Sequence, residues 1–114
     1  MRTLFYAVSF AALSISVAHA DDVMASRYGN TTIVTDARGM QTKVYYKADG
    51  TLTGKQMGRA FTGTWKVEGG QVCLHTTPTM PDMQEPFCRA VSARKVGDEW
   101  QVGDRRVKLV QGIQ

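Results

Sequence analysis

Apolar and polar residues alternate along most of the chain after Asn30. In the stretch 40–47, Thr42, Val44 and Tyr46 fall on one side of an extended backbone, and the residues between them fall on the other. A period of two predicts β-strands that bury one face and expose the other. The segments with this alternation, or with the matching β-branched and aromatic composition, are 31–36, 40–47, 51–56, 60–67, 71–76, 87–95, 99–102 and 105–110.

Short glycine-containing stretches separate these segments and predict tight turns. Asp49-Gly50 is the strongest hairpin signal among them. Before the first strand, 22–29 predicts a short helix, with Asp22 suited to cap its start and Gly29 suited to end it. Seven to eight short strands with one short helix favour a mainly β fold, a small antiparallel barrel or sandwich. A parallel sheet would need helices between the strands.

One predicted strand, 60–67, carries a tryptophan that can be interpreted in two ways. Phe61, Gly63 and Trp65 share a face, and Gly63 leaves room there for a bulky group to cross. Trp65 is either a core residue whose indole N–H finds one partner, or the floor of a ligand site to which Phe61 also contributes. The alternation itself is the same in both cases.

The first part of the chain, 1–20, has the layout of a secretory signal peptide. It begins with Arg2, continues with an apolar run at 4–17 and ends with a small–x–small cleavage pattern. The run is too short to span a bilayer comfortably, which favours a cleaved signal over a membrane anchor. We expect cleavage after Ala20, a single mature domain at 21–114 without a transmembrane segment, and a periplasmic or secreted location.

Two cysteines, Cys73 and Cys88, allow only one disulfide, and an exported chain meets an oxidising environment. A bridge closing this loop would stabilise a small domain by about 3 kcal/mol. The alternative is a redox-active or metal-binding pair. Their wide separation is not a C-x-x-C motif, and one histidine after signal cleavage completes no zinc site, so we favour the disulfide and expect no metal or cofactor.

The predicted loop 77–86 contains every proline of the chain. Prolines cannot donate to a strand ladder and they stiffen the backbone, so this loop is expected to protrude as a rigid segment. Met80 and Met83 are its apolar side chains. A stiff loop beside a disulfide is suited to enter the active site of another protein, because little conformational entropy is lost on binding.

Several short motifs together resemble a loose group of small exported proteobacterial domains of unknown function. The motifs are Gly29-Asn30-Thr31, Tyr46-x-x-Asp49-Gly50-Thr51, Gly63-Thr64-Trp65, Cys73, Cys88 and Gly112. This resemblance covers nearly the whole mature chain and implies a secreted β domain with a disulfide and no assigned catalytic residue. The Gly-x-Trp element is also similar to the lipocalin and calycin signature. In lipocalins it lies on the first strand, whereas here it falls in mid-chain of a shorter protein, which argues against a large ligand cup.

Catalytic groups are sparse in the sequence. His75 is the only histidine of the mature chain, and its neighbour on the same strand face, Cys73, is lost as a nucleophile when oxidised. Most carboxylates fall in predicted turns, where they serve backbone geometry and solubility. His75 is therefore interpreted as a strand residue beside the proline loop rather than a general base, and the protein is not expected to be an enzyme.

Basic residues gather in the last strands, and Arg94, Arg106 and Lys108 have the parity of outward positions. They form either a basic face that meets an anionic envelope component or a solvated face that keeps the sheet edge soluble. Removal of Arg2 lowers the formal net charge only from +4 to +3. Without runs of basic residues, nucleic acid is an unlikely partner.

These observations give three functional hypotheses for a protein that we expect to be a monomer. The first is a non-enzymatic binding or accessory protein of the bacterial cell envelope, acting through the Trp65 region or the proline loop on an unknown ligand or protein. The second is an inhibitor of an exported hydrolase that inserts Met80 and its neighbours. The third, least favoured, is a weak hydrolase with His75 as the base.

Overall fold

The computed structural model describes residues 23–79 and 86–114. One 3-10 turn, η1 (Ala25–Arg27), precedes the strands. The strands are β1 (Thr31–Thr35), β2 (Gln41–Tyr46), β3 (Thr51–Gln56), β4 (Arg59–Glu68), β5 (Gln71–Thr77), β6 (Phe87–Ala90), β7 (Glu99–Val102) and β8 (Arg105–Val110).

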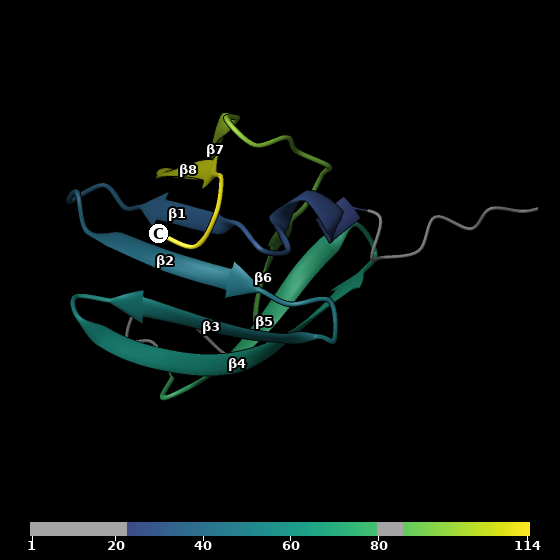
Figure 1. Cartoon of the computed structure of the whole chain (residues 1–114), viewed down its shortest axis with the longest axis horizontal. Helices are drawn as coiled ribbons and strands as arrows, with labels where there is room; N and C mark the ends of the chain where they lie inside the picture. The colour runs from purple at the N-terminus through teal and green to yellow at the C-terminus, as the bar shows by residue number, and fades with distance from the viewer. Residues whose placement is uncertain (1–22, 80–85) are drawn as a thin grey trace, which may run out of the picture.

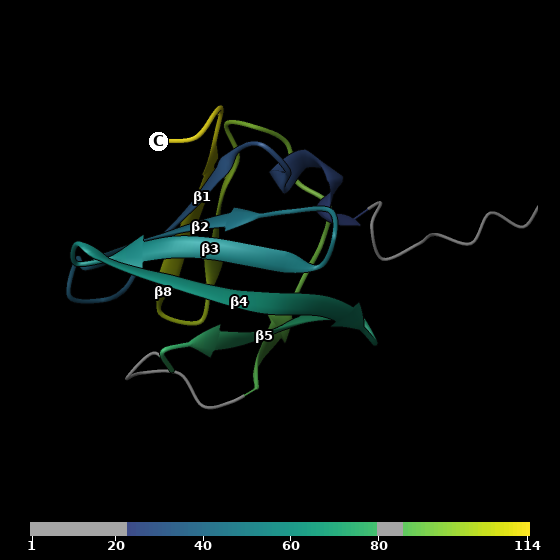
Figure 2. The same ribbon diagram turned by 60° about the horizontal axis from the view of Figure 1, so that its bottom comes forward.

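The eight strands form one antiparallel sheet that curls into a nearly closed barrel. Their order is β6-β5-β4-β3-β2-β1-β8-β7, so neighbours in the sheet are mostly neighbours in sequence, with β8 added beside β1. Two views show the sheet wrapping around a common interior, with β5 and β8 on opposite sides of it (Figure 1, Figure 2). The prediction of a small antiparallel β fold is confirmed, and of its two forms the barrel is correct. The edges β6 and β7 face each other across a seam without strand pairing.

Alternation along each strand places one set of side chains inside the barrel. Val44 and Tyr46 of β2 are buried, and so are Phe61 and Trp65 of β4, as the period of two predicts. The main buried cluster consists of Met24, Val44, Tyr46, Leu52, Phe61, Trp65, Val72 and Leu74. Burial of this apolar set is the main favourable term for so small a sheet.

One end of the barrel is filled by the segment that carries η1. Met24 is completely buried there, and Tyr28 lies with its ring centroid 6.1 Å from that of Trp65. Tyr46 meets Trp65 edge-on, also at 6.1 Å. The indole Nε1 of Trp65 donates to the carbonyl oxygens of Lys47 at 2.9 Å and Thr51 at 3.0 Å. We call this end the closed end, because its aromatic side chains are packed together and the indole N–H of Trp65 is satisfied.

Two strand glycines provide space inside the barrel. A Cβ on Gly54 would collide with the ring of Phe61, so this glycine lets Phe61 lie across β3. A Cβ on Gly63 would collide with the carbonyl oxygen of His75 in the neighbouring strand. The space predicted at Gly63 is therefore used by the backbone of β5, and the bulky side chain crosses at Gly54 instead.

Cys73 and Cys88 form the predicted disulfide. They are directly opposed residues of the antiparallel pair β5–β6, and their Cα atoms lie 4.0 Å apart. Their neighbours Val72 and Leu74 point inward, so the bridge lies on the outer side of the barrel. It fastens the short edge strand β6 to the body of the sheet.

Two predicted elements differ from the structure. In the described part of the predicted helix 22–29, Val23 and Met24 are helical and the 3-10 turn η1 follows, so the helical backbone ends at Arg27 and Tyr28 is extended. The predicted strand 87–95 ends at Ala90, since the chain then leaves the edge of the sheet to reach β7. The predicted signal peptide, 1–20, lies outside the described residues. Among the described residues, no helix has the length and apolar character needed to cross a membrane.

Candidate functional site

The end of the barrel opposite η1 contains a cavity of about 40 Å³, which we call the mouth. Its wall combines apolar residues from several strands with a polar and basic rim. These residues are Val34, Asp36, Met40, Thr42, Val44, Gln56, Phe61, Leu74, Thr76, Phe87, Arg89 and Arg105. A water molecule needs roughly 10–15 Å³ of such volume, so the mouth has room for about three water-sized groups. It is a small cup and not a lipocalin-sized chamber.

Two arginines of the mouth point into the barrel. Arg89 is paired with Val72, and Phe87 with Leu74, so these β6 side chains share the inner face with two buried core residues. Arg105 has the same parity on β8 as the buried Val107 and Leu109. Strand register therefore turns both side chains toward the inner face, where they line the cavity and stay partly exposed.

Phe87 lies close to both of these guanidinium groups. The Cζ atom of Arg89 is 5.3 Å from the centre of the Phe87 ring, and that of Arg105 is 5.5 Å from it. Contacts of this length are within the range of cation–π attraction. The ring holds the two positive charges beside the apolar wall of Phe61 and Leu74, at a place where a ligand could meet both kinds of surface.

The positive charge at the mouth is not neutralised by ion pairs within the described residues, since neither Arg89 nor Arg105 is paired with a carboxylate there. Among the described residues of the lining, Asp36 is the one acidic side chain. Its carboxylate accepts hydrogen bonds from the backbone N–H groups of Met40 and Arg38, each at 2.9 Å, and from the Arg38 guanidinium at 3.1 Å. The hydrogen bond from Met40 is the largest of the effects that lower the pKa of Asp36. Asp36 is thus engaged by its own loop, and the described lining of the mouth keeps a net positive charge.

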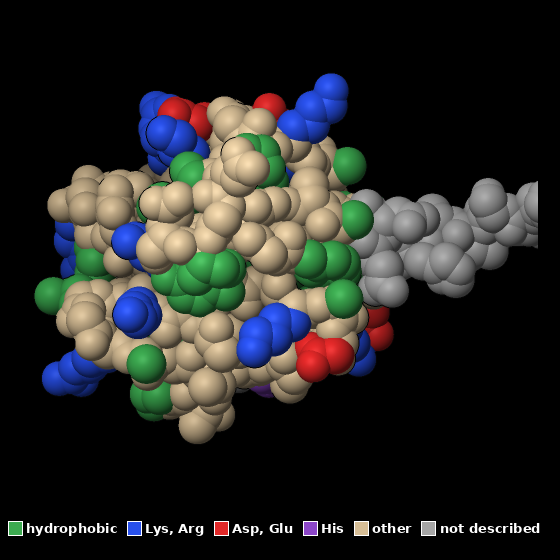
Figure 3. All heavy atoms as spheres, viewed as in Figure 1, with side chains coloured by type: hydrophobic (Ala, Val, Ile, Leu, Met, Phe, Trp, Pro, Cys, Tyr) green, Lys and Arg blue, Asp and Glu red, His purple; other side chains and the backbone are tan. Residues whose placement is uncertain are grey.

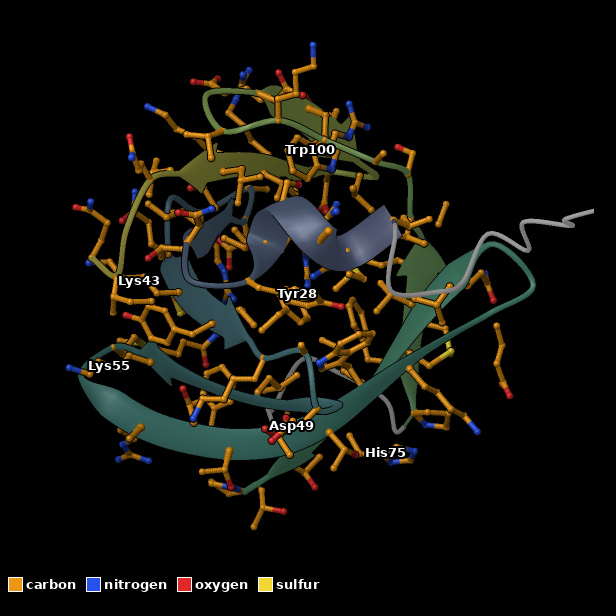
Figure 4. All side chains as sticks on the ribbon, turned by 45° about the vertical axis from the view of Figure 1, so that its right-hand side comes forward. Tyr28, Lys43, Asp49, Lys55, His75 and Trp100 are labelled. Carbon is orange, nitrogen blue, oxygen red and sulfur yellow. A yellow bond between two sulfur atoms is a disulfide. The ribbon has the colours of Figure 1, made fainter. Side chains whose placement is uncertain are left out.

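The structure separates the aromatic candidates predicted from the sequence. Phe61 lines the mouth, whereas Trp65 is 7% exposed and belongs to the closed end. Trp65 has two carbonyl partners for its N–H and packs on Tyr28 and Tyr46. Its position is that of a packing anchor, which is the core interpretation of the Gly-x-Trp segment. Figure 4 shows Tyr28 directed into this end of the barrel.

His75 lies on the outer side of β5, opposite Thr64 of β4, and is exposed. Figure 4 shows its ring pointing away from the barrel interior. Within the described residues, no three side chains of histidine, cysteine or carboxylate type come together as metal ligands would. The His75 side chain is therefore on the opposite face of β5 from the mouth and the arginines that line it.

The three basic candidates do not form one face. Arg106 and Lys108 are outward residues of β8 and both contact Glu99 of β7, at 3.2 Å and 3.8 Å. The prediction for Arg94 is wrong: it is not on a strand, it is half-buried, and its guanidinium lies 4.3 Å from the ring centre of Trp100. On the face shown in Figure 3, lysines and arginines are dispersed rather than gathered.

Met80 and Met83 of the proline loop lie outside the described residues. The two ends of that loop are described, with Pro78, Thr79 and Pro86 exposed. The strands from which it leaves and to which it returns, β5 and β6, are joined by the disulfide. The base of the loop is held in place by that bridge.

Sequence analysis named Phe61, which lines the mouth, but missed the other lining residues, above all Arg89 and Arg105. The signal was available in part, because Arg105 alternates in register with Val107 and Leu109. An arginine at an inward position breaks the expected pattern of apolar residues, and such a break marks a candidate site. For Arg89 the inward direction follows from its pairing with Val72, which only the structure reveals.

Comparison with known proteins gives no family for the chain: no family model and no curated protein sequence matches it.

Proposed function

We propose that this protein is a non-enzymatic binding protein of the bacterial cell envelope whose barrel mouth takes a small amphipathic anion. The ligand class is a carboxylate or phosphate group attached to a short apolar tail. The single observation that carries the proposal is the pair of inward arginines, Arg89 and Arg105, beside an apolar cavity and without a carboxylate partner among the described residues.

The chemistry of the lining supports this ligand class. Guanidinium groups bind carboxylates and phosphates through two parallel N–H···O hydrogen bonds, and these are strongest where water is partly excluded. Phe61, Leu74 and Val44 offer an apolar surface to the tail next to those charges. The small volume of the cavity limits the tail that can be fully buried to a few carbon atoms, so longer chains would extend past the rim.

The location in the envelope is supported by two features. The chain begins with the layout of a secretory signal, and the disulfide is of the kind that persists in oxidising compartments. Both agree with a periplasmic or secreted protein. We further propose that it acts by contact, as a monomer and without nucleic acid.

The test is a calorimetric titration of the oxidised protein with a series of straight-chain carboxylates from acetate to dodecanoate, matched by their methyl esters. We expect saturable binding that strengthens over the first few carbons and then levels off, and no binding of the esters, since they lack the charge. Equal binding of acids and esters, or no binding of any acid, would overturn the proposal.

A second candidate, an inhibitor of an exported hydrolase, is favoured by the disulfide that fastens the base of the proline loop. A rigid base reduces the entropy lost when a loop inserts into an active site. The combined substitution Met80→Ala and Pro81→Gly should abolish capture of such a hydrolase while leaving the thermal unfolding midpoint within about 2 °C. Unchanged capture would remove this candidate.

A further inference from the structure

A second, smaller cavity lies at the seam where β6 and β7 face each other without pairing. Its volume is about 20 Å³, which is room for one water-sized or monatomic species. Arg89, Ala90 and Val91 approach it from the β6 side, while Trp100 and Val102 approach it from β7. We call it the seam cavity.

Arg27 of η1 lines the seam cavity together with Arg89, and it is unusually buried at 5% exposure. Its guanidinium donates to the carbonyl oxygens of Val23 at 3.0 Å and Ser92 at 3.2 Å. A guanidinium carries five N–H donors, so these two bonds leave donors for a further acceptor. Within the described part of the chain, Arg27 forms no ion pair with a carboxylate.

The surroundings of Arg27 add more positive charge. Burial is the largest cause that lowers the pKa of Arg27, the nearby phenol of Tyr46 opposes this, and the positive charges of Arg89 and Arg94 lower it further. Since an arginine side chain stays protonated in proteins, the positive charge persists. A buried cation among like charges is costly unless an anion accompanies it.

A second, independent observation comes from Thr32 on β1. This residue is 2% exposed, it lines the seam cavity, and its Oγ1 has no hydrogen-bond partner among the described residues. An unsatisfied buried hydroxyl is costly, and most such groups in native proteins have a partner. The Thr32 hydroxyl and the Arg27 guanidinium are both donors on the wall of one small cavity, a combination that suits an acceptor without protons of its own.

We propose that the seam cavity binds a monatomic anion of the size of chloride, held by the guanidinium of Arg27 and the hydroxyl of Thr32. The apolar remainder of the wall, including Val72, Val91 and Val107, disfavours a larger hydrated ion. The site is distinct from the mouth, although Arg89 lines both cavities. The anion would join η1 to β1 and, through the hydrogen bond from Arg27 to the carbonyl oxygen of Ser92, to the segment that follows β6.

The first test measures thermal unfolding of the oxidised protein in sodium chloride and in sodium gluconate at the same ionic strength. Gluconate is too large for the cavity, so it serves as the control anion. We expect saturating chloride to raise the unfolding midpoint by about 5 °C in a saturable manner. Equal midpoints in the two salts would overturn the proposal, since a cavity that holds water responds to neither.

Two substitutions locate the effect, with a third as the matched control. Thr32→Val removes the unpartnered hydroxyl and keeps the shape, so the variant should be at least as stable as the parent in gluconate. Its chloride concentration for half the stabilisation should rise about tenfold. Arg27→Met should abolish the chloride response, whereas Thr35→Val, on the outer face of the same strand, should keep it. An undiminished chloride response in Thr32→Val would overturn the assignment even if Arg27→Met fails to fold.

A crystal grown in sodium bromide gives the direct reading. We expect an anomalous peak between the Arg27 guanidinium and Thr32 Oγ1, and its absence from crystals of Thr32→Val. An ordinary water at that position in the bromide crystal would refute the site.

Discussion

The two ends of the barrel are built from the same strands but are finished differently. At the closed end, Met24 is completely buried and the indole N–H of Trp65 meets two carbonyl oxygens. At the mouth, inward-facing side chains include Arg89 and Arg105, and a cavity of about 40 Å³ is left among them. The closed end thus resembles a protein core, while the mouth is less closely packed and contains charged side chains and a cavity. Stability should therefore be concentrated at one end and binding at the other.

The largest expected effect is on stability, from Trp65→Ala at the closed end. Loss of a buried aromatic side chain leaves a cavity and costs about 3–5 kcal/mol, a large part of the stability of a small domain. Urea unfolding followed by circular dichroism measures this. Trp65→Phe is the control, because it keeps most of the apolar area. A Trp65→Ala protein that unfolds at the parent's urea midpoint would show that this end is not the stabilising one.

The disulfide should come next in size. Replacing Cys73 and Cys88 together by alanine removes the restraint on the unfolded chain and should cost about 3 kcal/mol. The unfolding midpoint should fall by roughly 12–24 °C, at about 4–8 °C for each kcal/mol in a domain of this size. Scanning calorimetry of the oxidised parent and the double variant gives the comparison. An unchanged midpoint would mean that β6 is held to β5 by its other contacts alone.

Substitution of two adjacent residues of β8 should change stability little but should separate the inner from the outer surface in a binding measurement. Arg105 points into the mouth and Arg106 points outward to Glu99. Arg105→Gln should weaken binding of a short carboxylate about tenfold to a hundredfold, because one charged hydrogen-bonding partner is lost. Arg106→Gln should leave the affinity unchanged, since an exposed ion pair contributes little. Calorimetric titration of both variants shows whether the carboxylate binds at the inner or at the outer surface of the sheet.

The contribution of Asp36 to the stability of the folded protein should be lost in acid. Hydrogen bonds from Met40 and Arg38 lower the pKa of Asp36 below its ordinary value of 3.8. A carboxyl group with a lowered pKa stabilises the folded state above the pKa of the unfolded chain, and this contribution is lost as the pH falls through the folded value. At neutral pH the Asp36→Asn variant should therefore have a lower free energy of unfolding than the parent. This difference should become smaller below about pH 4. Urea midpoints at pH 7 and pH 3 measure this, and a deficit of the same size at both would contradict it.

Much of the architecture could be predicted from the sequence, because alternation of apolar residues and glycine turns is local information. The predicted segments 51–56, 99–102 and 105–110 coincide with β3, β7 and β8. The prediction failed after Ala90, because Ala90 pairs with Gln71, the first residue of β5, and beyond it β5 offers no further strand residue for pairing. Arg94 was therefore assigned to a strand face, while it lies against Trp100.

The site was harder to predict than the fold, because it depends on which strands meet. The candidates Arg106 and Lys108 were chosen for their outward parity, and they contact Glu99. The mouth arginines have the opposite parity, and apolar residues are the usual expectation there. The burial of Arg27 depends on the way η1 folds over the seam, and no local pattern encodes that contact.

The most direct test of the barrel mouth as a binding site is a two-dimensional ¹H–¹⁵N spectrum of the oxidised protein, recorded while hexanoate is added. We predict saturable shifts at the amides of Phe87, Arg89 and Arg105, with the indole N–H signal of Trp65 unmoved. Shifts that instead centre on Trp65 or on the outward residues Arg106 and Lys108, or a spectrum that does not change at all, would contradict the account.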